Sequence, residues 1–286
     1  MVQLTVPYPF DSETFVIFKE GIWNDPATNV YINELMDFCY LHPRKSVDYK
    51  NYISRRECLS LYDYDADLIS MKSRFEKVSP YLLTAKTLLE IGGSDGAFIS
   101  LVKDRNKDIR ITSIDSDEGT LSERVKYSDF NFGDIQDVVS QGLSFDIVCL
   151  FHVFEHILKP EKFLSAVKRV IQSKSIIIIE VPSLSDPLLN LYKSEAYKDF
   201  YFYSDHPFIY SHTSIERIMK ANGFKAQKII PHQRYGLDNH LQWLASGKPG
   251  GSNEYAAITL ELDKPYKVNL ERKGYTDSVI WVGRLK

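Results

Sequence analysis

Apolar and polar positions follow two different spacings along the chain from about Thr87 onward. Short apolar runs, such as Thr87–Ile91 and Phe145–Leu150, recur between stretches whose apolar residues lie three or four positions apart. Short apolar runs are typical of buried strands, and the wider spacing is typical of the helices that cover them. The pattern therefore predicts an α/β fold, in which a parallel sheet is connected by crossover helices.

The same spacing locates further elements. Strands are expected at 109–114, 175–181, 224–230 and 278–282, and a helix is expected from Pro160 with Phe163, Val167, Val170 and Ile171 on one face. The run 175–181 contains four consecutive isoleucines, which suit a strand covered on both faces. A second helix is expected to begin with a capping box of Thr213 and Glu216 and to end at Gly223.

These patterns divide the chain into four regions. Residues 1–70 are rich in tyrosine and weakly periodic, and we expect them to form N-terminal helices that cover the site. Residues 71–230 would form the core, and residues 276–286 its last strand. Residues 231–275 are too many for a simple loop. We therefore expect a helical insertion there that forms part of the substrate site.

The net charge and the cysteine content limit the partners and the cellular compartment that we expect. The formal net charge of −3 provides no positive field for nucleic acid or an anionic membrane, and no apolar run approaches the roughly 20 residues that a membrane helix needs. The N-terminus shows no signal-peptide pattern. Cys39, Cys58 and Cys149 have no C-x-x-C spacing, which disfavours disulfides or a thiolate zinc site. We expect a cytoplasmic protein without membrane insertion, with nucleic acid disfavoured as a partner and a homo-oligomer left open.

A glycine-rich turn, Gly92–Gly96, follows the strand over 87–91. A turn between a strand and a helix exposes backbone N–H groups at the carboxyl end of the strand, where a cofactor can bind. The dinucleotide fingerprint G-x-G-x-x-G does not fit, since Ser94 and Ala97 occupy its second and third glycine positions. Glu90 at the strand end would repel a pyrophosphate but attract an ammonium group.

Two further acidic residues lie at suitable positions for a nucleoside. Asp115 ends the second strand about 20 residues after the turn, where a carboxylate can accept both ribose hydroxyls. Asp134, in the turn Gly133-Asp134-Ile135, could accept an adenine amino group. Each has an alternative as an ordinary turn residue, because aspartate is common in turns.

Taken in order, these segments resemble the class I S-adenosylmethionine-dependent methyltransferases. The resemblance runs from about Thr87 to Phe224, with the last strand added, and rests on Glu90–Gly96, Ile114-Asp115, Gly133–Ile135, Phe145–Val148, Val153–His156, Ile179–Pro182 and His206–Ser211. It implies a Rossmann-like three-layer sandwich with a seven-stranded, mostly parallel sheet whose last strand is antiparallel. It also implies that S-adenosylmethionine is the cofactor.

The resemblance assigns roles in cofactor binding. Glu90 and the loop residues Gly92, Gly93, Ser94, Asp95 and Gly96 would hold the methionine end, Asp115 the ribose, and Asp134 with Ile135 the adenine. Phe151, which follows the strand over 145–150, is assigned to the same site. Ser94 departs from the more common glycine, and its small side chain is expected to fit.

His152, Glu155 and His156 are the candidates for catalysis. Their spacing of i, i+3 and i+4 would place them on one face of a helical turn. In one interpretation Glu155 and His156 only brace the following helix. In another, His156 is a general base that Glu155 orients, since a hydroxyl acceptor must lose a proton.

In a third interpretation Glu155, His156 and the distant His206 bind a divalent metal, with His152 as a fourth ligand. The chain resembles small-RNA 2′-O-methyltransferases and ubiquinone-pathway O-methyltransferases, which use an E-x-x-E-H motif and a later ligand for a magnesium-like ion. Here His152 replaces the first glutamate of that motif. The replacement weakens the match, because imidazole suits softer ions.

The acceptor is expected to be a small molecule, such as a sugar or nucleotide-sugar. In the insertion Arg234 could hold a phosphate or carboxylate beside Tyr235, and His206 is a further substrate candidate; Arg234 could equally be a solvated charge. Sugar C-methyltransferases usually begin with a cysteine zinc site, which is missing here, so O-methylation in a surface-polysaccharide or natural-product pathway is favoured. The alternatives are a metal-dependent RNA or quinone O-methyltransferase and a non-catalytic S-adenosylmethionine-binding subunit.

Overall fold

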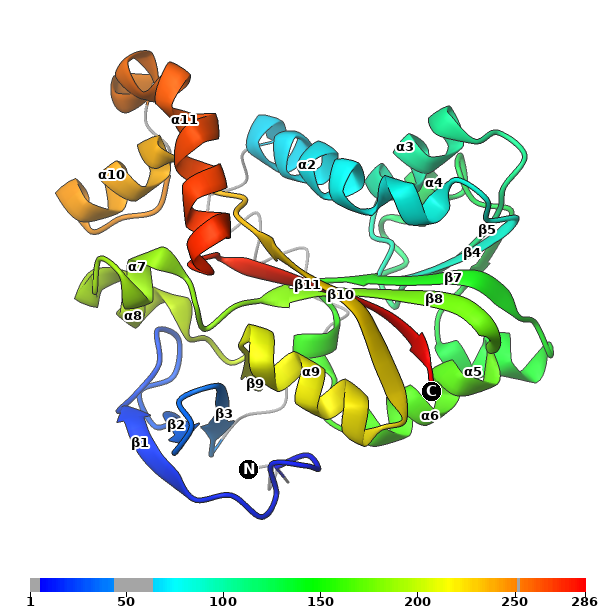
Figure 1. Cartoon of the computed structure of the whole chain (residues 1–286), viewed down its shortest axis with the longest axis horizontal. Helices are drawn as coiled ribbons and strands as arrows, with labels where there is room; N and C mark the ends of the chain where they lie inside the picture. Colours follow the sequence, from blue (N-terminus) through cyan, green and yellow to red (C-terminus); the bar gives the residue numbers. More distant parts are fainter. Residues whose placement is uncertain (1–5, 44–63, 251–252) are drawn as a thin grey trace. The chain divides into compact units, whose positions relative to one another are not determined.

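The computed structural model describes residues 6–43, 64–250 and 253–286 (Figure 1). Cys58 and part of the predicted N-terminal cover lie outside these residues. The chain forms two compact units. We call residues 48–180, 218–230 and 281–286 the core unit, and residues 1–47, 181–217 and 231–280 the accessory unit.

A seven-stranded sheet forms the framework of the core unit. Its order is β10-β11-β8-β7-β4-β5-β6, with β4 at Thr87–Ile91, β5 at Arg110–Ile114, β6 at Phe130–Phe132, β7 at Phe145–Phe151, β8 at Ile171–Pro182, β10 at Phe224–His232 and β11 at Ser278–Leu285. The pairs β4–β5, β4–β7, β5–β6 and β7–β8 are parallel. In Figure 1, β11 runs in the opposite direction to β8. The predicted fold class is confirmed.

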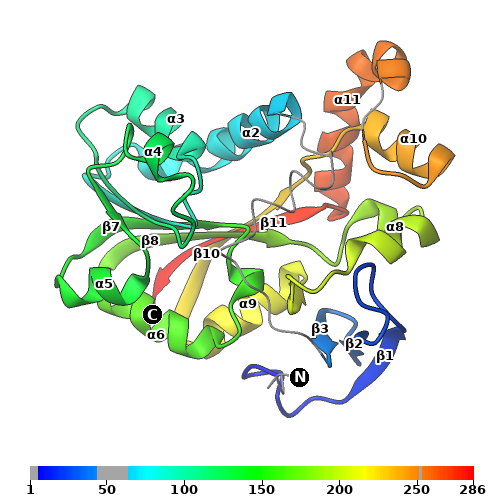
Figure 2. The same cartoon turned by 180° about the vertical axis from the view of Figure 1, so that it is seen from behind.

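Helices cover both faces of this sheet. Figures 1 and 2 show α2 (Tyr64–Leu82), α3 (Ala97–Arg105) and α4 (Leu121–Arg124) on one face, with α5 (Ile135–Ser140) and α6 (Pro160–Arg169) on the other. The isoleucine run of β8 is enclosed as predicted, since Ile177, Ile178 and Ile179 are fully buried. Its strand begins at Ile171 rather than Ser175, so Ile171 belongs to β8 and not to the preceding helix.

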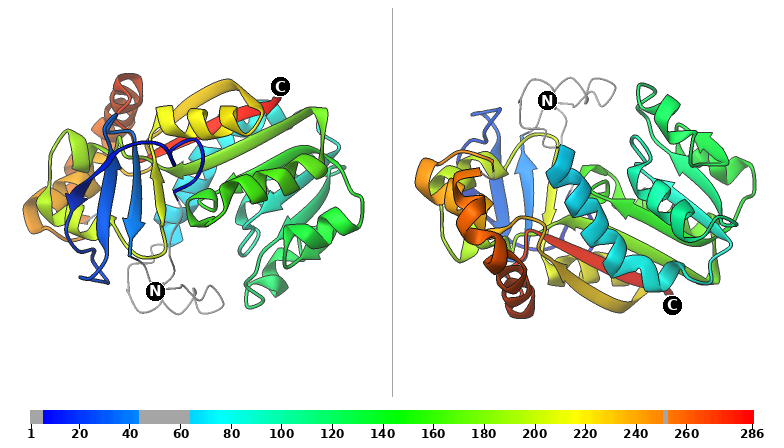
Figure 3. Two further views of the ribbon diagram at one scale, coloured as in Figure 1. Left: turned by 90° about the horizontal axis from the view of Figure 1, so that it is seen from below. Right: turned by 90° about the horizontal axis from the view of Figure 1, so that it is seen from above.

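The accessory unit contains a second sheet, which the sequence analysis did not predict. Strands β1 (Phe15–Lys19), β2 (Asn29–Asn33), β3 (Phe38–His42) and β9 (Phe208–Tyr210) form it in that order (Figure 3). The expectation of N-terminal helices is therefore wrong for the described residues up to His42. Alternate residues, Val30 with Ile32 and Cys39 with Leu41, enter one apolar cluster. This period-two burial is a property of strands.

Helices complete the accessory unit: α7 (Pro187–Asn190), α8 (Glu195–Tyr201), α10 (Leu237–Ser246) and α11 (Asn253–Lys273). The helical character predicted for the insertion is confirmed by α10 and α11. Trp243 of α10 packs with Leu188 and Tyr197 in a buried cluster. Among the described residues, no helix combines the length and the apolar character needed to cross a membrane.

Helix α9 (His212–Ala221) corrects the predicted capping box. Ser211, not Thr213, precedes the first turn, and its hydroxyl accepts the N–H groups of Thr213 and Ser214 at 3.1 Å. Ser214 Oγ in turn accepts the N–H of Ser211 at 2.8 Å. The helix therefore starts two residues earlier than predicted, because the two serine hydroxyls satisfy the N–H groups of its first turn.

Candidate functional site

The turn after β4 has the backbone geometry that its glycines allow. Gly92 and Gly96 have φ angles of 80° and 83°, a region that favours glycine. A Cβ atom at Gly92 would collide with Val153 Cγ2, so a glycine is also required by packing. The N–H of Gly92 donates to the carbonyl of Ile114 at 2.7 Å, which fixes the turn to the end of β5.

Ser94 occupies the turn with a φ of 45°, which is uncommon for a residue with a side chain. Two contacts hold it there. Its N–H donates to Asp115 Oδ2 at 2.7 Å, and its carbonyl accepts from Arg124 Nη1 at 2.7 Å. These anchors explain how the turn accommodates serine at a position where glycine is more common.

Glu90 lies beneath this turn and is 3% exposed. Burial raises the pKa of its carboxyl well above the usual value and Asp115 adds to this, whereas Arg74 and Arg124 act in the opposite direction. Glu90 Oε2 has no hydrogen-bond partner among the described residues, and neither has the buried Ser113 Oγ.

Both unpartnered oxygens border Gly93, where a side chain would fill the space: a Cβ there would lie 2.8 Å from Glu90 Oε2 and would collide with Ser113 Oγ. Buried polar atoms normally have partners. The residues present therefore fit a ligand with an ammonium group, such as the amino-acid end of S-adenosylmethionine.

The two nucleoside-binding candidates both bond to backbone groups. Asp115 accepts the N–H of Ser94 on Oδ2 and that of Asp117 on Oδ1, at 2.7 and 2.8 Å. Asp134 caps α5 by accepting the N–H of Gln136 at 2.7 Å. A carboxylate oxygen can accept two bonds, so capacity remains on both residues. Their ribose and adenine roles, with Ile135, stay predictions.

The catalytic candidates lie at the carboxyl end of β7. His152 has a left-handed φ of 56° and precedes a short 3₁₀ turn, η2 (Phe154–His156). Its Nδ1 lies 3.4 Å from Oε1 of the fully buried Glu155, and its Nε2 lies 3.4 Å from Glu180 Oε1. The predicted proximity of His152 and Glu155 is present, although not on one regular helical turn. Val153 packs this segment against Gly92.

Arg74 and Glu180 lie beside the catalytic candidates, and the sequence analysis gave neither of them a role. Glu180, at the end of β8, is fully buried and forms an ion pair with Arg74 of α2, whose side chain is 7% exposed. The Arg74 guanidinium also lies 4.9 Å from the ring centre of Phe151, which packs on Phe98 at 4.5 Å. The sequence did contain a signal for Glu180, because a charged residue directly after four isoleucines stands out at the end of a buried strand. Nothing in the weakly periodic sequence of α2 indicated Arg74.

The substrate candidates belong to the accessory unit. Arg234 Nε donates to the buried Asp277 at 3.1 Å, and its guanidinium lies 5.1 Å from the ring centre of Tyr235. Arg234 is thus held in place and is not a freely solvated charge. His206 Nε2 is 2.7 Å from the hydroxyl of Tyr203. The proposed metal ligands Glu155 and His156 belong to the core unit and His206 to the accessory unit, so the metal set stays a prediction.

Near Asp277, the partner of Arg234, lie further buried polar groups to which the sequence analysis gave no role. Asp186 accepts the Tyr197 hydroxyl at 2.7 Å and the N–H of Leu188 at 2.7 Å. Burial, and then the charge of Asp277, raises the pKa of Asp186 to about 7. His240 lies in the same unit, and burial lowers its pKa to about 4. These groups come from segments distant in sequence, which is why no local motif revealed them.

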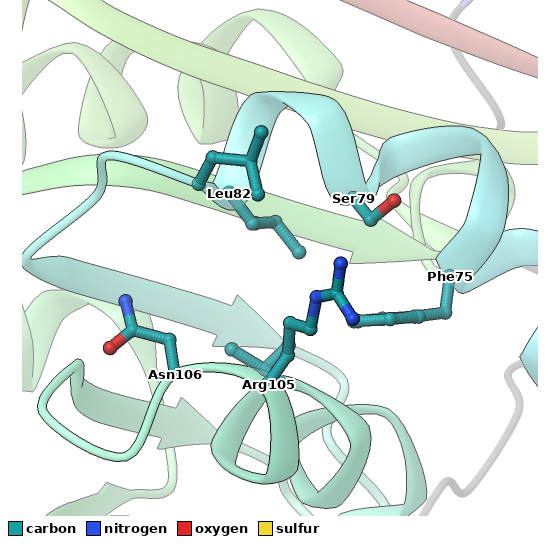
Figure 4. Close-up of a pocket in the computed structure, with 7 residues that line it drawn as sticks. Phe75, Ser79, Leu82, Arg105 and Asn106 are labelled. Atoms are coloured by element: carbon teal, nitrogen blue, oxygen red, sulfur yellow. The ribbon is translucent and has the colours of Figure 1, made fainter.

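A cavity of about 290 Å³ lies between α2 and α3 (Figure 4). Its lining consists of Phe75, Ser79, Leu82, Leu83, Val102, Arg105 and Asn106. Arg105 ends a helix that starts directly after the glycine turn, about 12 Å away along the axis. Because cofactors in open α/β sheets bind at the carboxyl ends of the strands, this cavity is separate from the candidate site.

Comparisons with known proteins agree with this geometry. The structure is similar to an S-adenosylmethionine-dependent methyltransferase from Archaeoglobus fulgidus, with a TM-score of 0.54 and 18% identity over 83% of this chain and 100% of that chain. It is similar to the plantazolicin methyltransferase BpumL in complex with S-adenosylhomocysteine, with a TM-score of 0.55 and 16% identity over 83% and 93% of the two chains. A possible histamine N-methyltransferase from Thermotoga maritima gives a TM-score of 0.52 and 16% identity over 83% and 98%.

A search of curated protein sequences finds no match. A family of methyltransferase domains, however, matches residues 64–229, which is more than half of the chain and includes every strand from β4 to β9. The matched segment contains the glycine turn, the buried Glu90 and the segment that carries His152 and Glu155. The chain therefore belongs to the class I S-adenosylmethionine-dependent methyltransferases, as its sequence predicted.

Proposed function

We propose that this protein binds S-adenosylmethionine at the Glu90–Gly96 turn and transfers its methyl group to a hydroxyl of a sugar or other small polar metabolite. The observation that carries cofactor binding is the buried Glu90, whose Oε2 has no partner among the described residues and lies next to Gly93, where a Cβ would come within 2.8 Å of it. The similar BpumL structure, which contains S-adenosylhomocysteine, supports the choice of cofactor.

The chain's own residues perform four tasks in this proposal. The cofactor supplies a methyl group that is already activated on a sulfonium. Glu90 binds the ammonium group, Asp115 accepts the ribose hydroxyls, and Asp134 accepts the adenine amino group. His156 takes the proton of the acceptor hydroxyl, with Glu155 holding the imidazole in position. Because the protein forms no covalent bond with the methyl group, positioning of the reactants and exclusion of water account for most of the rate acceleration.

Arg234, Tyr235 and His206 are proposed to bind the acceptor. Arg234 keeps a fixed orientation through Asp277, and a fixed guanidinium suits recognition of a phosphate, such as that of a nucleotide-sugar. Tyr235 is 42% exposed, so its ring offers a surface on which a sugar can stack.

The alternative to a general base is a divalent metal, held by Glu155, His156 and His206, that assists removal of the proton from the acceptor hydroxyl. One carboxylate and two imidazoles suit zinc-like or iron-like ions better than magnesium. Full activity after dialysis against EDTA would remove this alternative, whereas activity restored only by an added divalent ion would support it.

Isothermal titration calorimetry tests the central proposal. We expect binding of S-adenosylmethionine and S-adenosylhomocysteine, and no binding of NAD. Tight binding of NAD without binding of S-adenosylhomocysteine would overturn the proposed cofactor. Binding without turnover on any member of a broad panel of hydroxylated metabolites would favour a non-catalytic S-adenosylmethionine-binding subunit.

A further inference from the structure

Helix α11 turns a polar side towards the rest of the accessory unit. Asp263 accepts the first backbone N–H of α10, the neighbouring helix in Figures 1 and 2, at 3.0 Å. The hydroxyl of Tyr266 forms a hydrogen bond with Nδ1 of the buried His240. Thr259, one turn before Asp263, is 4% exposed. Residues three and four positions apart share one side of a helix. The side of α11 that faces its own unit is therefore mainly polar, although Leu270 near the helix end is also buried.

The other sides of α11 carry apolar side chains that remain exposed. Ile258 is 70% exposed, Leu260 77%, Leu262 55% and Val268 54%. We call these four residues the α11 patch. Single exposed apolar residues are normal on a protein surface, but four of them in about three turns of one helix indicate an interaction site. A surface helix normally buries its apolar side and exposes its polar side. The reversed arrangement in α11 is typical of a helix that binds a partner.

Two opposite charges lie within the patch. Glu261 and Lys264 are both exposed, and neither has an ion-pair partner among the described residues. When two copies of α11 pack antiparallel about a two-fold axis midway between Leu262 and Asp263, residue 261 of each copy is level with residue 264 of the other. Opposite charges then meet twice across the interface. A parallel pair in register would bring like charges together instead, which is unfavourable.

We propose that α11 is the interface of a homodimer, in which a second copy of this chain packs antiparallel on the α11 patch. Dimers that use the same surface on both copies are the most common oligomers of soluble proteins. The charges favour a second copy over an unrelated protein, because α11 is complementary to itself. This inference goes beyond the proposed function, which needs only one copy of the chain.

The size of α11 limits the affinity of such a dimer. A helix of 21 residues is about 31 Å long and about 10 Å wide. Two such helices alone bury less than the roughly 800 Å² that each partner of a stable complex usually contributes. We therefore expect a dissociation constant in the micromolar range.

Sedimentation velocity of the full chain at about 1–100 μM measures this association, since a dimer of micromolar affinity dissociates within that range. We expect dimers at the upper end and monomers at the lower end. Ile258→Gln combined with Leu262→Gln should weaken association more than about 100-fold, because each copy loses two apolar contacts. Leu35→Gln, at a residue of the accessory unit that is 66% exposed, is the matched control and should leave association unchanged.

Charge reversal tests the antiparallel register. Glu261→Lys alone and Lys264→Glu alone should each weaken the dimer about 10-fold, because both ion pairs become contacts between like charges. An equal mixture of these two variants should restore the affinity, because each then offers the charges that the other needs. The double variant, Glu261→Lys with Lys264→Glu, should dimerise like the unaltered protein, since the charges are only exchanged.

A chain that stays monomeric at the highest concentration would overturn the proposal, and its co-sedimentation with vesicles of phosphatidylglycerol would assign the α11 patch to a membrane surface instead. A dimer that survives Ile258→Gln with Leu262→Gln would place the interface elsewhere. A mixture of the two charge variants that associates no better than either alone would exclude the antiparallel register. The thermal unfolding midpoint of each variant, measured in dilute solution, should match that of the unaltered monomer, because glutamine and the exchanged charges suit an exposed helix.

Discussion

One buried acid in each unit, Asp277 and Glu90, differs sharply from the other in its hydrogen bonds. In the accessory unit, Asp277 is 1% exposed and accepts the backbone N–H groups of Arg234 and Tyr235, the Nε of Arg234 and the side-chain amide of Gln233. In the core unit, Glu90 is equally buried, but its Oε2 has no partner among the described residues. A buried acid with a full set of donors stabilises the fold, whereas one without them is suited to a ligand. The predictions below test this contrast.

The largest effect is expected for His156 of the core unit. His156→Ala should reduce turnover about 100- to 10,000-fold, the usual contribution of a general base, because the acceptor hydroxyl then loses its proton unaided. Affinity for S-adenosylhomocysteine should not change. Steady-state methyl transfer and calorimetry on the same preparation measure both quantities. Unchanged turnover would return His156 to a structural role.

For Asp277 of the accessory unit we expect a loss of stability rather than a loss of function. Asp277→Ala leaves several buried donors without an acceptor, so we expect the free energy of unfolding to fall by about 2–4 kcal/mol. Cofactor affinity should remain within about twofold. Urea denaturation measures the stability, and Asp199→Ala, at a carboxylate 70% exposed, serves as control with a change below about 0.5 kcal/mol. A small effect at Asp277 would contradict the structural role that its donors imply.

Gly92 tests whether the turn is shaped for packing as well as for backbone freedom. Gly92→Ala adds both a positive-φ penalty and a collision with Val153, so we expect a loss of about 1–3 kcal/mol in stability and weaker binding of S-adenosylhomocysteine. Gly142, with a φ of 65° and nothing within 4 Å of an added Cβ, is the matched control. Its alanine variant should lose about 1–2 kcal/mol and no affinity. Adding Val153→Ala to Gly92→Ala should restore part of the loss; no restoration would show that the collision is unimportant.

The smallest expected effect is the change in folding stability with pH that Asp186 contributes. Its folded-state pKa of about 7 lies above the unfolded value of 3.8, so the folded protein holds a proton that the unfolded chain has released. The stability from this group is complete below about pH 4 and is lost as the pH rises to about 7. Between pH 5 and 6 the loss should be about 1 kcal/mol. His240 acts in the opposite direction between about pH 4 and 6.5, because its folded pKa is lowered.

Urea denaturation at several pH values isolates the Asp186 contribution by comparison with Asp186→Asn. The difference in stability between the two proteins should change with pH across this interval, because only the aspartate titrates. A difference that is independent of pH would contradict the assignment of the raised pKa to Asp186.

Local sequence predicted most strands of the core sheet because the signals of those strands are local. The isoleucine run predicted β8, and the β4 strand with its glycine turn predicted where a cofactor would bind. The accessory sheet was missed because β1, β2 and β3 have only five residues each and β9 has three. So few residues cannot distinguish period two from chance, and β3 pairs with β9 across about 170 positions of sequence.

What the sequence by itself determined is the positions of β4, β5, β7, β8, β10 and β11 along the chain and the identity of the glycine turn, since both depend on residue spacing along a continuous segment. Only the tertiary structure decided which buried acidic side chains have hydrogen-bond partners. The pair of Arg74 and Glu180 joins residues 106 positions apart, and Asp277 draws donors from more than 40 positions away. Hydrogen-bond satisfaction depends on neighbours in space, and no local pattern specifies them.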